Sequence, residues 1–117
     1  APHANMVVVS SQLATRGSPH GADYAASKAA LSTWARSLAL AVGPEGKRVN
    51  VLAPGYVDTD ILAGDSDEKR NQRIQEVPLK RIGTGDDMAS IVSFLLSNDA
   101  AYITGSVLHA NGGLYLP

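Results

Sequence analysis

Apolar and polar positions alternate in blocks along the chain, and the blocks predict the main elements. The run from Met6 to Val9 is uninterrupted, apolar and mostly β-branched, and Ser10-Ser11 closes it, which predicts a short strand buried on both faces. From about Ala22 to Val42 an alanine-rich segment predicts a helix that Ser18-Pro19 can start and Gly43-Pro44 can stop. Its apolar stripe, at helical spacing, consists of Leu31, Trp34, Ala35, Leu38 and Val42.

Two more apolar blocks predict strands. The segment from Arg48 to Ala53 is a predicted strand that Pro54-Gly55 ends, because proline cannot extend a central ladder. Strand, helix and strand in this order are typical of a βαβ unit, in which the strands are parallel and the connection is right-handed. A last strand is predicted from about Ser106 to Ala110, followed by Asn111-Gly112-Gly113.

Two segments between these strands differ in polarity. Asp65-Ser66-Asp67-Glu68 resembles an N-cap with a glutamate three residues on, and it opens a charged segment to Glu76 whose only large apolar side chain is Ile74. This pattern predicts a surface flap. Thr84-Gly85-Asp86-Asp87 is another capping pattern, and it precedes a helix whose apolar stripe is Met88, Ile91, Val92 and Leu95. The predicted order is β-α-β-(α)-α-β, an α/β fold with a parallel sheet under helical cover.

Composition narrows the function classes. The 117 residues, 44% of them hydrophobic and 18% charged, suit one soluble domain. Ten Lys and Arg residues against eleven Asp and Glu residues give a net charge of −1, which predicts neither a nucleic-acid nor a membrane partner. No apolar stretch approaches the roughly 18 residues of a membrane span. The absence of cysteine excludes thiolate catalysis and fits a cytoplasmic protein. His3, His20 and His109 lack metal-ligand spacing, so no metal site is predicted.

Tyr24, Lys28 and Ser11 are the residues that could carry chemistry. Tyr24 and Lys28 lie four apart on the predicted helix and therefore on one face of it. A phenol with its ordinary pKa of about 10 is a poor acid near neutrality, but a unit charge about 4 Å away contributes roughly 4 kcal/mol, or about three pKa units, at an effective dielectric of about 20. Ser11 follows the first strand, where open parallel sheets bind ligands. The alternative is a chance pair on an exposed helix face and a serine that only ends a strand.

Several motifs in order resemble the carboxyl-terminal half of the short-chain dehydrogenase/reductase family. They are Ser11, Tyr24-Ala25-Ala26-Ser27-Lys28, Arg48-Val49-Asn50-Val51-Leu52-Ala53-Pro54-Gly55, Thr59, and Thr104-Gly105 through Gly112-Gly113. The resemblance covers nearly all of the chain and includes the serine thirteen positions before the tyrosine. It implies the carboxyl-terminal part of a doubly wound, Rossmann-like parallel sheet, with 3-oxoacyl thioester reductases and sugar or polyol dehydrogenases as the closest subclasses.

The resemblance also implies roles for individual residues in a hydride transfer between a carbonyl or alcohol substrate and NAD or NADP. Tyr24 would be the general acid or base and would also contact the cofactor, and Ser11 would hydrogen-bond the same substrate oxygen. Lys28 would lower the pKa of Tyr24 and contact the nicotinamide ribose. Four residues after the second strand would hold the nicotinamide, namely Pro54, Gly55, Val57 and Thr59. The charged segment after Asp60 would cover the substrate, and residues 12–18 would form another part of that wall.

One part of the family pattern has no counterpart in the chain. No glycine-rich turn follows a strand and opens a helix, so the pyrophosphate-binding element is absent. We therefore expect residues 1–117 to form a single partial Rossmann-like domain without its amino-terminal dinucleotide phosphate-binding half, truncated near Ala1, and inactive alone. The alternative is a non-catalytic fragment or interaction module that binds no dinucleotide. The resemblance implies a homo-oligomer, a tetramer or a dimer, and the exposed first strand predicts self-association of the isolated chain.

Overall fold

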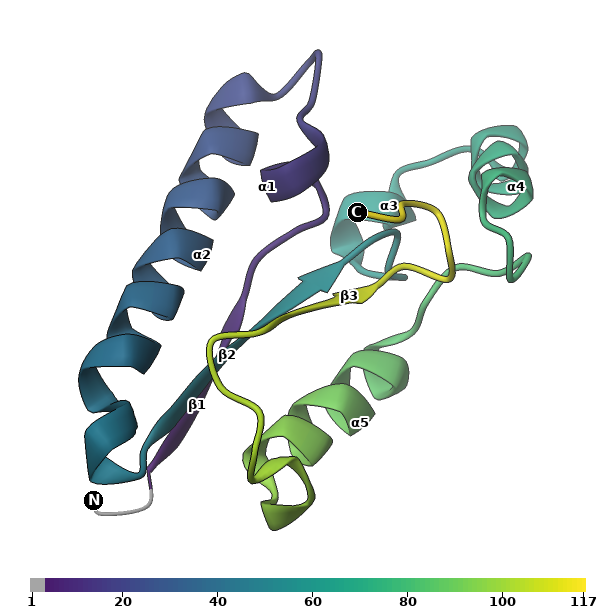
Figure 1. Cartoon of the computed structure of the whole chain (residues 1–117). Coiled ribbons are helices and arrows are strands. Elements are labelled where there is room, and N and C mark those ends of the chain that lie inside the picture. Colours follow the sequence, from purple (N-terminus) through teal and green to yellow (C-terminus); the bar gives the residue numbers. More distant parts are fainter. Residues whose placement is uncertain (1–3) are drawn as a thin grey trace.

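A three-stranded parallel sheet organises the structure (Figure 1). The computed structural model describes residues 4–117, without the side chains of residues 60 and 61, so His3 lies outside the described residues. The sheet order is β1 (Asn5–Val9), β2 (Arg48–Pro54) and β3 (Val107–Ala110). Val51 of β2 pairs with Val8 on one side and with Val107 on the other. The predicted parallel order of the strands is confirmed.

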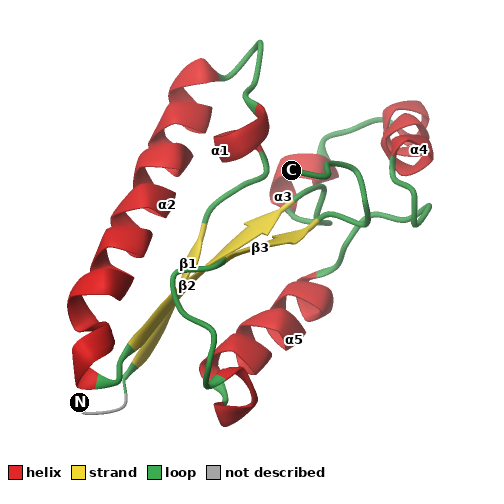
Figure 2. Cartoon of the chain, viewed as in Figure 1, coloured by secondary structure: helices red, strands yellow, loops and turns green. Residues whose placement is uncertain are grey.

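Two long helices cover opposite faces of the sheet (Figure 2). They are α2 (Ala22–Val42) and α5 (Gly85–Leu96). The short helix α1 (Leu13–Arg16), α3 (Asp60–Ala63) and α4 (Asp67–Glu76) lie beyond the carboxyl ends of the strands (Figure 1). The described residues also form two 3₁₀ turns, at Gly43–Glu45 and Asn98–Ala100. The carboxyl edge of the sheet is therefore surrounded by loops and short helices, as sites in open α/β sheets are.

Small side chains bring α2 close to the sheet. Ala35 and Ala39 pack on Val49 and Val51, and this buried cluster is surrounded by half-buried Val8, Leu38, Val42 and Val107. Trp34 was predicted to share this face, but its side chain is 53% exposed. The prediction is wrong because Trp34 lies next to the narrow stripe of small residues that actually contacts β2, and the large apolar side chain lies outside it.

The first strand is less buried than its sequence predicts. Met6 and Val9 are 44% and 49% exposed, whereas Val49 to Ala53 of β2 are all buried. Among the described residues β1 pairs only with β2, so β1 is an edge strand and β2 is the central one. Burial on both faces is therefore wrong for β1, because an apolar run shows what a strand can bury and not what covers it.

Helix ends follow local capping chemistry with small shifts. Gly21 and not Ser18-Pro19 precedes α2. The predicted stop at Gly43-Pro44 is confirmed, because α2 ends at Val42 and a 3₁₀ turn over Gly43–Glu45 follows, which ends at Gly46 with φ +75°. Helix α4 is capped by Ser66, which accepts the N–H of Lys69, one residue after the predicted cap at Asp65.

The two later helices differ in burial as predicted. No residue of α4 is buried, which confirms that it lies on the surface. Thr84 and Asp87 form the predicted capping box of α5. On that helix Leu95 is buried, and Met88, Ile91 and Val92 are half-buried. Within the described residues, no helix is both long and apolar enough to span a membrane.

Candidate active site

The ends of β1 and β2 bring the first two site segments together. The N–H of Ser10 donates to Leu52 O at 2.7 Å, and the N–H of Gln12 donates to Pro54 O at 3.0 Å. Ser11 therefore lies beside the start of the Pro54-Gly55 loop, at the carboxyl edge of the sheet. Its Oγ accepts the N–H of Leu13 at 3.2 Å, which begins α1.

Helix α2 brings Tyr24 and Lys28 to the same edge. The Nζ of Lys28 donates to Val9 O, the last carbonyl of β1, at 3.2 Å, and lies 5.7 Å from the centroid of the Tyr24 ring. The Tyr24 side chain is 46% exposed and open to a substrate. A cation, a phenol and the hydroxyl-bearing end of a strand thus occupy one region of the sheet edge.

A buried pair of serines fixes this helix on the strand, and sequence reasoning missed it. The hydroxyl of Ser32 lies 2.8 Å from Ser10 Oγ, and both hydroxyls are within 3.1 Å of Lys28 O. Ser10 and Ser32 are 4% and 5% exposed. Since both side chains are hydrogen-bonded, the turn of α2 that carries Lys28 is held at a fixed distance from β1. Two serines 22 positions apart give no signal in a periodicity pattern.

The loop after β2, which carries Pro54, Gly55, Val57 and Thr59, is held by two other segments. Gly55 N–H donates to Ala110 O at 3.1 Å, and a Cβ on Gly55 would lie 2.6 Å from Asn111 Cβ. Only glycine therefore fits where this loop contacts the turn after β3. On the other side, Val57 forms a parallel bridge with Gly83, and the Asp58 N–H donates to Gly83 O at 2.8 Å.

Tyr56 lies in the same loop with a perturbed hydroxyl. Partial burial raises its pKa above the ordinary 10.0, and its hydrogen bond to Glu76 adds to the rise, while nearby Arg73 opposes it. The neutral phenol is the form that this environment favours. Sequence reasoning did not select Tyr56, because its partners belong to a distant helix.

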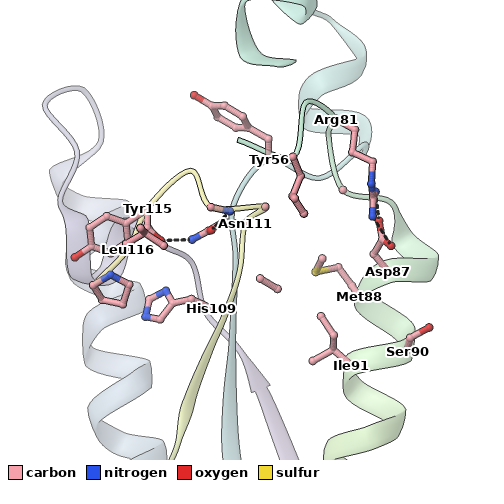
Figure 3. A pocket seen from close by; sticks show the side chains of 16 residues that line it. Tyr56, Arg81, Asp87, Met88, Ser90, Ile91, His109, Asn111, Tyr115 and Leu116 are labelled. Carbon is pink, nitrogen blue, oxygen red and sulfur yellow. Dashed lines mark hydrogen bonds and ion pairs between the residues drawn. The ribbon is translucent and has the colours of Figure 1, made fainter. Parts of the chain in front are cut away.

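A cavity of about 480 Å³ lies next to this loop, between α5 and the residues after β3 (Figure 3). Arg81 and Asp87 form a two-point ion pair at its rim, with Nη1–Oδ2 and Nη2–Oδ1 distances of 2.6 and 3.1 Å. Hydrogen bonds from Arg81 and from the Thr84 N–H hold the pKa of Asp87 well below its ordinary value. None of the predicted catalytic or cofactor residues lines this cavity. We locate the candidate site at the open sheet edge and not in the cavity, because the chemically competent side chains lie at that edge.

Comparison with known proteins decides the family. A profile described as Enoyl-(Acyl carrier protein) reductase matches residues 1–115. A Brucella melitensis crystal structure titled as a short-chain dehydrogenase/reductase, glucose/ribitol dehydrogenase, superposes with a TM-score of 0.90 at 32% identity, over 97% of this chain and 46% of that one. This chain belongs to the short-chain dehydrogenase/reductase family.

Two curated relatives and a second solved structure within the short-chain dehydrogenase/reductase family carry the same name. The chain is 42% identical over 114 residues to the 3-oxoacyl-(acyl-carrier-protein) reductase FabG of Escherichia coli, covering 97% of this chain and 47% of that protein. It is 43% identical over 109 residues to FabG of Chlamydia muridarum, covering 93% and 44%. A 3-oxoacyl-(acyl-carrier-protein) reductase structure from Brucella melitensis gives a TM-score of 0.90 at 32% identity, over 97% and 42%. The chain thus spans about half the length of the curated relatives it matches.

These comparisons confirm the predicted fold class. The chain corresponds to part of a Rossmann-like short-chain dehydrogenase/reductase domain, and its described residues form a three-stranded parallel sheet. The predicted catalytic and nicotinamide residues come from the segment after β1, from α2, and from the end of β2 with the loop that follows it, and these segments meet at one edge. Their roles remain predictions.

Proposed function

We propose that this chain supplies the catalytic, carboxyl-terminal half of an NAD(P)-dependent oxidoreductase that interconverts a carbonyl and an alcohol. A 3-oxoacyl thioester is the substrate class that the named relatives favour. The observation that carries the proposal is the position of Lys28, whose Nζ lies 3.2 Å from the last carbonyl of β1 and 5.7 Å from the Tyr24 ring, one turn away on α2. The Ser11 hydroxyl follows the end of the same strand, two residues after Val9.

In the proposed mechanism the chain's own groups handle the proton. When bound, a nicotinamide dinucleotide is the two-electron hydride donor or acceptor for the substrate carbon. Tyr24 donates its phenolic proton to the substrate oxygen as the carbonyl π electrons move onto that oxygen, and takes the proton back in the oxidising direction. Ser11 donates a hydrogen bond to the same oxygen and orients it. Lys28 supplies positive charge beside the phenol and donors for a ribose hydroxyl.

A buried acceptor beside the loop after β2 fits a nicotinamide. Within the described part of the chain, the buried Gln12 Oε1 has no hydrogen-bond partner, and it lies 3.6 Å from the position of a Cβ on Gly55. A buried acceptor of this kind is satisfied by a ligand that brings an N–H donor, as a carboxamide does. We propose that Pro54, Gly55, Val57 and Thr59 hold the nicotinamide of either NAD or NADP.

We also propose that activity needs the half of the fold that the longer relatives carry and this chain does not. The relatives extend to about twice its length, and the chain contains no glycine-rich turn for the pyrophosphate. The 117 residues alone would then bind substrate groups without turnover, and the intact protein would act as a homo-oligomer. A non-catalytic interaction module gains no support from relatives that are reductases by name.

The test is Tyr24→Phe in the intact oxidoreductase that contains this chain, assayed with NADH and NADPH and a 3-oxoacyl thioester. Loss of a general acid lowers kcat by about 10²- to 10⁴-fold. Tyr102→Phe is the matched control, because Tyr102 is fully exposed and outside the site, and it should leave kcat unchanged. Turnover by Tyr24→Phe at the wild-type rate would rule out the mechanism.

A further inference from the structure

Helix α4 is joined to the loop after β2 by a two-point ion pair. Arg70 Nη1 donates to Asp58 Oδ1 at 3.2 Å, and Nη2 donates to Oδ2 at 3.1 Å. The planar fork matches the carboxylate edge to edge, which fixes direction as well as distance. The hydrogen bonds from Arg70 lower the pKa of Asp58 below its ordinary 3.8, so the carboxylate is charged at neutral pH.

A second set of contacts joins the same two segments. The Tyr56 hydroxyl donates to Glu76 Oε2 at 2.8 Å. The Arg73 guanidinium lies 4.8 Å from the centroid of the Tyr56 ring, and its Nε donates to Asp65 Oδ2 at 2.6 Å. On α4 the contacting residues are spaced three apart, so they share one face of the helix, and that face is turned toward the loop.

These polar contacts matter more than usual for the position of α4, because no residue of the helix is buried. Its sequence offers one large apolar side chain, Ile74. A helix normally keeps its place by burying an apolar face. Buried Val77, directly after α4, and the hydrogen bond from Lys80 Nζ to Gln75 O at 2.7 Å hold the end of the helix, and the contacts with Tyr56 and Asp58 hold the face that carries Arg70, Arg73 and Glu76.

The loop after β2, which α4 contacts, is itself held by backbone hydrogen bonds. Gly83 N–H donates to Tyr56 O at 3.0 Å and Gly83 O accepts the Asp58 N–H at 2.8 Å, so both contacting residues of the loop are paired to the body through their backbone. Figure 1 shows α4 beyond the carboxyl ends of the strands, where the loop emerges. A displacement of the loop is therefore expected to move α4, and a displacement of α4 to move the loop.

We propose that Tyr56, Asp58, Arg70, Arg73 and Glu76 form a latch through which the nicotinamide loop sets the position of α4 over the substrate. This inference rests on the proposed function, which assigns the loop to the cofactor, and on the predicted role of the charged segment after Asp60, which contains α4, as the cover of the substrate. The five are positioning residues and touch no reacting atom. Cofactor bound against the loop holds the loop, and through the latch α4, more firmly than in the free protein. Substrate then has less to order, which couples the two binding events.

Asp58→Asn in the intact enzyme tests the latch by proteolysis, since it leaves the trypsin sites at Lys69, Arg70 and Arg73 in place. In the wild type, saturating NADPH or NADH should slow cleavage within α4. In Asp58→Asn that protection should be lost while the Kd for the cofactor stays within twofold. Equal protection in the two proteins would overturn the latch, and so would protection that is absent from the wild type.

Steady-state kinetics are the second test of the latch. Asp58→Asn and Arg70→Gln should each raise KM for a 3-oxoacyl thioester by about two- to fivefold with kcat within twofold, as expected for an exposed ion pair. The exchange variant Asp58→Arg/Arg70→Asp should recover most of the wild-type KM. Lys47→Gln, which breaks a surface pair with Glu45, is the control and should change neither constant. An unchanged KM in both single variants would overturn the latch.

The two proposals fail in distinguishable ways. If Tyr24→Phe abolishes turnover and Asp58→Asn behaves like wild type in both arms, the oxidoreductase assignment stands and the latch is wrong. If the wild-type enzyme neither binds nor turns over a nicotinamide dinucleotide, the proposed function fails and the latch fails with it.

Discussion

Gly112→Ala should destabilise the protein by an amount that follows from two separate geometric facts. Gly112 has φ +64°, in the left-handed region, which costs an alanine about 1–2 kcal/mol. A Cβ there would lie 2.6 Å from Cγ1 of Val77, a β-branched side chain that is only 2% exposed and has little freedom to move. Overpacking of this kind costs about 1–3 kcal/mol. The expected loss in the free energy of unfolding is the sum, about 2–5 kcal/mol.

Gly46→Ala separates the two contributions. Gly46 has φ +75°, also left-handed, but a Cβ there meets no atom within 4 Å. Urea unfolding of the intact protein, followed by circular dichroism, should give a loss of about 1–2 kcal/mol for this control. Val77→Ala combined with Gly112→Ala should be less destabilised than the sum of the single changes, since it removes the obstructing methyl group. The reasoning is refuted if Gly112→Ala and Gly46→Ala lose the same amount within about 0.5 kcal/mol.

Three further predictions concern groups described above. Ser32→Ala removes the buried bond to Ser10 and should cost about 1 kcal/mol in urea unfolding, whereas Ser37→Ala, on the exposed side of the same helix, should cost much less. Asn50→Ala leaves Ile103 O and Ser106 N–H without their 2.8 and 3.1 Å partner, and should lower the unfolding free energy by about 1–3 kcal/mol in the same assay. Because its folded-state pKa is depressed, Asp58 contributes stability that is present above pH 3.8 and lost as pH falls through the folded value. The stability difference between wild type and Asp58→Asn, measured from pH 6 downward, should therefore shrink below about pH 4; a constant difference would contradict the pairing with Arg70.

Local patterns in the sequence were enough to predict the main elements. The apolar runs of β1 and β2, the long alanine-rich helix and the capping box at Thr84 and Asp87 each depend on residues close together in the chain. The short helices α1 and α3 have four residues each, too few to show a period, and the patterns did not predict them.

Predictions that needed the third dimension were less successful. Periodicity placed Trp34 on the core face because it is apolar, although α2 meets the sheet through alanines. The apolar run of β1 predicts burial on both faces, and it was the missing half of the family pattern that predicted the exposed sheet edge.

In the candidate site, too, local features could be predicted and contacts between distant segments could not. The spacing of Ser11, Tyr24 and Lys28 and the Pro54-Gly55 pair could be selected from the sequence, because a strand end and one helix turn define them. The contacts that hold the site together could not: Ser10 meets Ser32 across 22 positions, and Asp58 meets Arg70 across 12. Such pairs are set by which loops meet at the sheet edge, and ordinary serine, aspartate and arginine side chains give no advance sign of it.

The serine pair between β1 and α2 has a consequence for the connection that joins them. Ser10 and Ser32, together with the bond from Lys28 to Val9 O, fasten the helix directly to the strand. The segment between them, residues 13–20, is therefore not what keeps Tyr24 at its distance from the strand end. Its length and composition are free to change without dismantling the phenol and lysine arrangement, so this segment is the natural place for substrate preference to diversify among proteins that share the same chemistry.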